Sequence, residues 1–149
     1  MISAKRLELK KMFSTHYQRY KSNSEKYKNT NKSDLLILFY AIECGLKSLV
    51  LKNNKKNSTN DFKNINDNNG NSIADKLKGS SGHDLKYLLR IVKIGNYTLP
   101  NLPIINNTNK VSCSEYNQVW RYGIDSDYDT EKAIEKELNE IVEKLEMQV

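Results

Sequence analysis

The pattern of apolar and polar positions predicts two long helices in the first third of the chain. Over residues 3–27, apolar and aromatic side chains recur at steps of three and four residues, the spacing of one helix face. This predicted inner face consists of Leu9, Met12, Phe13, His16 and Tyr20. Residues 33–52 are apolar almost all round, as expected for the central helix of a bundle. Ser33 is the expected N-cap of this helix, and Asp34 suits the positive end of its dipole.

The next part of the chain is polar. Residues 53–71 are of low complexity and rich in Asn and Lys. They have little apolar surface to offset the entropy of ordering, so we expect a long, flexible loop. A short helix is predicted over residues 72–79, where Ser72 and Asp75 have the spacing of a capping box.

A tight turn and a fourth helix are predicted to follow. Gly79 and Gly82 are expected to bracket the turn. The predicted inward residues of the helix after it are Leu85, Leu88, Leu89 and Val92. Residues 95–110, which include two prolines, indicate an irregular crossing loop.

Two further helices are predicted near the end of the chain. Ser112 and Glu115 have capping-box spacing at the start of the first, and Gly123 is its expected end. The last helix is expected over about residues 130–147. Its predicted inner face consists of Ala133, Ile134, Leu138, Ile141, Val142 and Leu145. No strand is predicted, so the expected fold is all-α, one domain over residues 1–149 that forms an up-down bundle of four to five helices.

Hydropathy and cysteine usage bear on where the protein resides. No apolar run reaches the roughly 18 residues of a membrane span, and the start of the chain lacks the apolar segment of a secretory signal. Cys44 and Cys113 are far apart and have no metal-ligand spacing. We therefore expect a cytoplasmic protein with no disulfide and no membrane contact.

The net charge of +6 is unevenly distributed. Residues 1–28 and 29–124 each carry +6, whereas residues 125–149 carry −6. A basic body with an acidic last helix favours a nucleic-acid partner, or association between opposite faces of two molecules. An AT-rich genome, whose codons favour Asn, Lys, Ile and Tyr, would produce the same positive charge without any ligand.

Common catalytic motifs are missing from the sequence. The two histidines, His16 and His83, have no metal-binding spacing and no Cys or carboxylate cluster beside them, so neither a metal nor a cofactor is expected. The sequence contains no nucleophile elbow. The Gly/Ser segment at 79–82 lacks the lysine of a phosphate-binding loop.

Glu43 and Lys47 interrupt the apolar second helix. They are four residues apart and share a face, with Glu on the favoured N-terminal side. An exposed pair of this kind contributes little stability, but few polar positions surround this one, so we expect it to be partly buried and to need further polar partners. The candidates for this polar centre are His83, Asp84, Arg121 and Tyr122, with Trp120 in its apolar lid.

Three segments occur in order before the last helix: "FYAIECGLKSLVLK" (39–52), "GHDLKYLL" (82–89) and "VWRYG" (119–123). As a set they resemble HEPN domains, small all-α proteins of prokaryotic defence and toxin–antitoxin loci. The resemblance covers about residues 33–147, with the Asn-rich loop as an insertion. It implies a metal-independent endoribonuclease whose Arg is followed four to six residues later by His, usually duplicated across a homodimer. Such a His transfers protons near neutral pH, and the Arg stabilises charge on the reacting phosphate.

The sequence departs from this pattern after Arg121. The residues that follow are "YGIDSDY", which contain no His. Asp127 stands six residues on, but beside a cation its pKa should fall, so it cannot serve as a general acid. Only Arg121 is therefore carried over from the family motif. His83 belongs to the "HDL" segment, for which a structural or supporting role is favoured over a catalytic one.

Three functions stay open from the sequence. The first is a catalytically degenerate HEPN-like subunit of a bacterial antiphage defence or toxin–antitoxin system, which binds RNA or a protein partner as a homodimer or with the product of a neighbouring gene. The second is a metal-independent endoribonuclease that uses Arg121 with His83 or Tyr122. The third is an autonomous nucleic-acid-binding protein whose basic first helix follows a phosphate backbone while its tyrosines stack on bases. The contact residues of that helix would be Lys10, Lys11 and Arg19.

Overall fold

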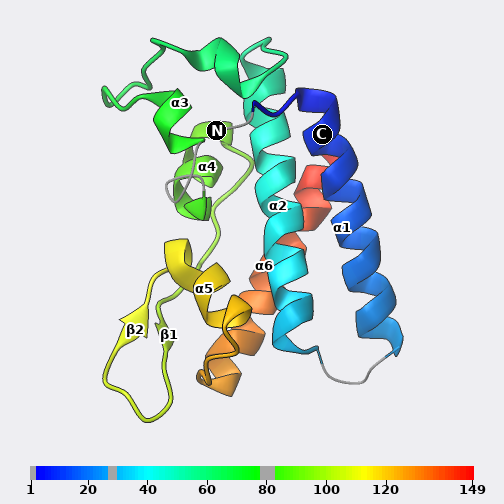
Figure 1. The fold of residues 1–149 in the computed structure, drawn as a ribbon, viewed down its shortest axis with the longest axis vertical. Coiled ribbons are helices and arrows are strands. Elements are labelled where there is room, and N and C mark those ends of the chain that lie inside the picture. Colours follow the sequence, from blue (N-terminus) through cyan, green and yellow to red (C-terminus); the bar gives the residue numbers. More distant parts are fainter. Residues whose placement is uncertain (1–2, 27–29, 78–82) are drawn as a thin grey trace.

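Three long helices form the frame of the protein (Figure 1). The computed structural model describes residues 3–26, 30–77 and 83–149. The long helices are α1 (Arg6–Lys26), α2 (Lys32–Asn53) and α6 (Tyr128–Gln148). Shorter helices lie between α2 and α6 in the chain: α3 (Ile73–Lys76), α4 (Leu85–Val92) and α5 (Tyr116–Arg121), with 3-10 turns at Thr59–Phe62 and Cys113–Glu115.

A small antiparallel sheet accompanies the helices. It pairs β1 (Leu102–Pro103) with β2 (Lys110–Val111). The described residues therefore contain six α-helices and two short strands, where the sequence predicted four to five helices and no strand. The predicted crossing loop closes on itself as a hairpin, and its strands are too short to show a pattern of alternation along the sequence.

Helix α2 lies at the centre and packs against α1, α4, α5 and α6 (Figure 1). α6 runs parallel to α2. The ammonium of Lys32 lies 3.0 Å from Glu131 where both helices begin, and that of Lys52 lies 2.7 Å from the backbone oxygen of Gln148 where both end. The long connection of residues 54–127 returns the chain to the end of the molecule at which α2 starts, so α2 and α6 point the same way, and the up-down order of the helices stays a prediction.

The start of α2 lies slightly before the predicted position. Asn31, not Ser33, is the N-cap, and its side chain accepts a hydrogen bond from the backbone N–H of Asp34 at 2.9 Å. The Asp34 carboxylate accepts one from the Asn31 backbone at 3.4 Å, which completes a capping box. The same carboxylate accepts a 2.8 Å hydrogen bond from Asn23 of α1. Asp34 is therefore buried but has partners, and it connects the end of α1 to the start of α2.

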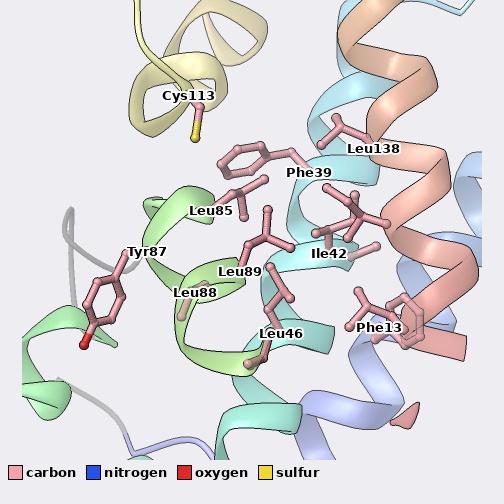
Figure 2. Packing of buried hydrophobic residues seen from close by; sticks show 14 of the residues in the cluster. Phe13, Phe39, Ile42, Leu46, Leu85, Tyr87, Leu88, Leu89, Cys113 and Leu138 are labelled. Atoms are coloured by element: carbon pink, nitrogen blue, oxygen red, sulfur yellow. The ribbon is translucent and has the colours of Figure 1, made fainter. Parts of the chain in front are cut away.

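The hydrophobic core lies on two sides of α2 (Figure 2). On one side α4 turns leucines toward Phe39, Ile42 and Leu46 of α2, and on the other Phe13 of α1 and Leu138 of α6 close the core. The predicted inward residues of α4 are all buried: Leu85, Leu88, Leu89 and Val92. Because α2 contributes to both sides, its near-continuous apolar sequence is explained.

Two residues of the predicted inner faces lie outside the core. Met12 is 38% exposed and Ala133 is exposed, while their neighbours Phe13 and Ile134 are buried. Adjacent residues of a helix differ by about 100° in direction, and in these two pairs Phe13 and Ile134 are the members that face the core. The remaining predicted residues of α6 are buried: Leu138, Ile141, Val142 and Leu145.

The Asn-rich segment 53–71 makes contacts that its composition did not indicate. Phe62, in a 3-10 turn, is fully buried, and the carboxylate of Asp67 accepts a 2.9 Å hydrogen bond from the Tyr87 hydroxyl. Ser72 caps α3 by accepting a hydrogen bond from the backbone N–H of Asp75, which is one of the two bonds of the predicted capping box. The flexibility of this segment stays a prediction, and the predicted Gly79–Gly82 turn lies outside the described residues.

The segment before α6 differs from its prediction in detail. Ser112 makes no side-chain cap, and its hydroxyl pairs with that of Ser114 instead, so the predicted capping box with Glu115 is absent and a 3-10 turn precedes α5. Gly123 has φ +64 just after α5 and ends the helix, as predicted. Asp127 then caps α6, which begins at Tyr128.

We predict that Gly45→Val destabilises the protein by about 2 kcal/mol, because a side chain there overpacks the contact of α2 with α1 and α6. A Cβ at this position would lie 3.0 Å from Leu145 and 3.1 Å from the Phe13 ring. Urea unfolding measures the effect. Ala133→Val is the control, since it adds the same β-branched residue at an exposed helix position and costs about 0.5 kcal/mol. Equal losses in the two variants would contradict this packing account.

Candidate functional site

The carboxylate of Glu43 has a partner on each of its two oxygens. Lys47, one turn further along α2, places its ammonium 2.7 Å from Oε1. His83 places Nδ1 3.0 Å from Oε2. His83 directly precedes Asp84, the N-cap of α4, so this contact connects the middle of α2 to the start of α4. The sequence-predicted pair is present, and His83 is its additional partner.

Burial makes these contacts stronger than those of a surface ion pair. The side chains of Glu43 and Lys47 are only 9% and 13% exposed. Burial raises the pKa of Glu43, but the hydrogen bond from His83 and the charge of Lys47 outweigh it and hold the pKa below its ordinary value of 4.5. Glu43 is therefore ionised near neutral pH. Since an ionised carboxylate only accepts hydrogen bonds, Nδ1 of His83 must carry the hydrogen.

Tyr40 places Arg121 near this histidine. The Tyr40 and His83 rings are tilted at 47° to each other, with centroids 6.2 Å apart. The guanidinium of Arg121 donates a hydrogen bond to the Tyr40 hydroxyl. His83 is 27% exposed and Arg121 is exposed. An imidazole oriented by Glu43 and an arginine held by Tyr40 therefore lie along one side of α2, and we call Glu43, Lys47, His83, Tyr40 and Arg121 the polar centre.

Three residues expected in the polar centre have other roles. Asp84 accepts a 3.2 Å hydrogen bond from the backbone N–H of Tyr87 and caps α4. Trp120 is buried, and its indole N–H donates to Glu131 at 3.2 Å. Tyr122 is 69% exposed, so the chain reaches the surface just after Trp120. Among the described residues, no hydrogen bond or ion pair joins Asp84, Trp120 or Tyr122 to Glu43 or His83, but Tyr122 interacts with the Arg121 side chain and therefore adjoins the polar centre.

Asp127, which stands where the family motif would place its histidine, is a helix cap. Its carboxylate accepts hydrogen bonds from the Thr130 hydroxyl at 2.6 Å and from the Thr130 backbone N–H at 3.0 Å. These bonds hold the pKa of Asp127 below its ordinary value. The direction of this shift was predicted, but its cause is Thr130 and not Arg121. Asp127 cannot supply the missing proton-transfer group.

The basic first helix does not form a compact nucleic-acid surface. Lys10, Lys11 and Arg19 are all exposed, but at about 100° per residue they spread over roughly half of the helix circumference. Tyr20 is buried and donates a 3.1 Å hydrogen bond to Glu135. Tyr17 stacks between Phe13 and Tyr20. Burial makes the expected stacking on bases wrong for Tyr20, whereas for the partly buried Tyr17 it stays a prediction, and Tyr27 lies outside the described residues.

The described residues offer no other obvious reactive group. They contain no cluster of three or more His, Cys, Asp or Glu side chains that could hold a metal ion. Both cysteines are free; Cys44 is partly buried and Cys113 is buried. Burial, followed by the charge of Glu43, raises the pKa of Cys44 to about 11, so its thiol stays protonated. None of the helices described is both long and apolar enough to cross a bilayer.

Sequence reasoning did not identify Tyr40. It lies three residues before Glu43 and seven before Lys47, which places all three on neighbouring positions of one helix face. In a helix this apolar, three side chains with polar groups at that spacing indicate a helix face that contacts other polar groups. The signal was therefore present, but its partner Arg121 could not be inferred because the two are 81 residues apart.

Comparisons of this chain with protein-family models, curated proteins and solved structures find no match. The resemblance to HEPN domains consequently depends on the three sequence segments alone.

We predict that Glu43→Gln destabilises the protein by about 3 kcal/mol, because it leaves the Lys47 ammonium buried without its counter-ion. The double variant Glu43→Leu/Lys47→Met should lose less, since it removes both charges and keeps apolar packing. Urea unfolding of the three proteins measures this. Equal stability of Glu43→Gln and the wild type would show that the contact contributes nothing to folding.

A pH dependence follows from the low pKa of Glu43. The stability that its ionised form contributes is present above the unfolded-state value, near 4.5, and is lost as the pH falls through the lower folded-state value. The difference in unfolding free energy between wild type and Glu43→Gln should therefore be largest above about pH 4.5 and shrink below it. Urea titrations at several pH values test this. A difference that stays constant on acidification would contradict the assignment.

Proposed function

We propose that this protein is a HEPN-like subunit of a bacterial antiphage defence or toxin–antitoxin system, that it binds RNA, and that it is catalytically degenerate. The observation that carries the proposal is the position of Arg121. Its guanidinium is exposed at the surface, held by the Tyr40 hydroxyl beside His83. A fixed, exposed guanidinium is well suited to bind a phosphate through paired hydrogen bonds.

Two features support binding without cleavage. Asp127 caps a helix through Thr130, so the position of the family's catalytic histidine serves the fold. His83 donates through Nδ1 to a buried carboxylate that also pairs with Lys47, an arrangement that stabilises the junction of α2 and α4. Both potential proton-transfer groups thus have structural partners, which favours the degenerate form of the domain.

The charge distribution supports an assembly with RNA or with another protein chain. Residues 1–124 carry +12 and residues 125–149 carry −6. Opposite charges on separate parts of the chain favour contact between unlike faces, as in a homodimer or a complex with a neighbouring gene's product, and leave a basic region for nucleic acid.

A second candidate function is a metal-independent endoribonuclease, favoured by the hydrogen bond between Glu43 and His83. Because Nδ1 donates to Glu43, Nε2 of the neutral ring has a free lone pair and can accept a proton. In that reaction Nε2 would remove the proton of an RNA 2′-hydroxyl, whose oxygen attacks the adjacent phosphorus. The bond from phosphorus to the 5′-oxygen of the next nucleotide breaks, that oxygen takes up a proton from the protonated ring or from water, and a 2′,3′-cyclic phosphate remains. Arg121 would stabilise the charge on the phosphate oxygens.

The proposed function predicts that the wild-type protein binds single-stranded RNA and leaves it intact in EDTA. Arg121→Ala should weaken binding and reduce the slope of log affinity against log salt by about 0.7, the value for one lost phosphate contact. Arg19→Ala is the control, since it removes another exposed arginine away from the polar centre. Fluorescence anisotropy at several salt concentrations measures both variants.

The outcomes separate the candidates. Absence of RNA binding, or equal losses in Arg121→Ala and Arg19→Ala, would contradict the proposed function. Cleavage in EDTA that is lost in both Arg121→Ala and His83→Gln would instead establish the endoribonuclease. His83→Gln is chosen because its amide can still donate to Glu43 and preserve the fold.

A further inference from the structure

The outer face of α4 carries three exposed cations. Lys86 and Arg90 are four residues apart on one face of α4, and Lys93, the residue that caps its C-terminal end, lines the same hollow as both. No ion pair joins any of them to another residue in the described parts of the chain. Three positive charges near one another without counter-ions repel each other, and an anionic ligand would relieve this repulsion.

Tyr87 organises this face. Its buried ring lies on the side of α4 away from α2 (Figure 2), and its hydroxyl donates to Asp67 at 2.9 Å. The guanidinium of Arg90 and the ammonium of Lys76, from α3, each lie 5.2 Å from the ring centroid. Tyr87 therefore brings a fourth cation beside Arg90, and cation–π contacts hold both in place.

Hollows surround these cations. One, of about 510 Å³, is lined by all three α4 cations together with Asn96 and Tyr97. A second, of about 370 Å³, lies between Lys76, Lys86 and Arg90. A third, of about 400 Å³, is bordered by Arg90, Lys93 and the Asn-rich loop. Arg90 lines all three, so a ligand could pass from one to the next along the same cations.

The acidic groups near this face are already engaged or lie at its edge. Asp84 caps α4, and Asp67 accepts hydrogen bonds from Tyr87 and from the loop backbone at Asn69 and Asn71. The carboxylates of α6 lie near Tyr97, at the edge of this face. Burial raises the pKa of Tyr97, and the charges of Glu140 and Glu137 raise it further. Asp67 lines the 400 Å³ hollow and Asp84 the 370 Å³ hollow, whereas the 510 Å³ hollow is lined by Lys86, Arg90 and Lys93 and by no carboxylate.

We infer that this face, defined by Lys76, Lys86, Arg90 and Lys93, binds the phosphate backbone of single-stranded RNA. Lys93 follows Lys86 by seven residues, so the two lie about 10 Å apart along the helix direction, which exceeds a single phosphate and matches a run of two or three nucleotides. The half-buried ring of Tyr97 and the amide of Asn96 line the largest hollow, and such groups stack on and hydrogen-bond to bases. The inference rests on the proposed function and assigns its RNA a surface distinct from α1.

The test compares two triple variants that each remove three exposed cations. One is Lys86→Gln/Arg90→Gln/Lys93→Gln, and the control is Lys10→Gln/Lys11→Gln/Arg19→Gln. A labelled single-stranded RNA of about 15 nucleotides is titrated at about 50 to 200 mM salt. The α4 variant should bind roughly tenfold or more weakly than the wild type at low salt, with the salt slope reduced by about 2, while the α1 variant changes less.

The outcomes test the α4 site and the proposed RNA binding separately. Wild-type affinity in the α4 variant, or a larger loss in the α1 variant, would overturn the α4 site and leave the proposed RNA binding intact. A wild-type protein that binds no RNA would overturn the proposed function and the site with it. Circular dichroism of both variants checks the fold, which exposed Lys and Arg substitutions should leave unchanged.

Discussion

The buried carboxylate of Glu43 is the constraint on which the rest of the structure depends. An ionised group with 9% exposure needs partners for its charge, and Lys47 and His83 supply one for each oxygen. Lys47 belongs to the same helix as Glu43, so their contact does not determine where α4 lies. His83 comes from the chain directly before α4, so its contact determines where α4 begins against α2. The leucines of α4 then reach the core, and its cations face outward.

A second carboxylate, Glu131, is partly buried and has a similar role at the start of α2. Oε2 of Glu131 accepts hydrogen bonds from Ser126 at 2.6 Å, Lys32 at 3.0 Å and Trp120 at 3.2 Å. These donors come from the start of α2, from α5 and from the approach to α6. The parallel pairing of α2 and α6 thus has specific polar contacts in addition to its apolar surface. Both carboxylates connect elements that are distant in sequence, which apolar burial alone would orient less specifically.

The sequence predicted the long helices and most of the core, because three- and four-residue periodicity reports directly which side of a helix is buried. It also predicted the pairing of Glu43 with Lys47, since that contact lies within one helix. It did not predict the direction of α6, because periodicity carries no information on how helices are ordered in space. The contacts of Glu131, Tyr40 and Tyr87 were missed for a related reason, as each joins residues from different elements. The α4 cations were visible in the sequence, but without the fold nothing distinguished them from other surface lysines.

The account requires that His83 donate through Nδ1 to ionised Glu43 in the folded protein. Long-range ¹H–¹⁵N correlation spectroscopy of the wild-type protein, at a pH where the imidazole is neutral, reports which ring nitrogen carries the hydrogen. The predicted result is the Nδ1–H tautomer of His83, with a slowly exchanging Nδ1 proton. A dominant Nε2–H tautomer, or a ring that exchanges freely between both, would contradict the account.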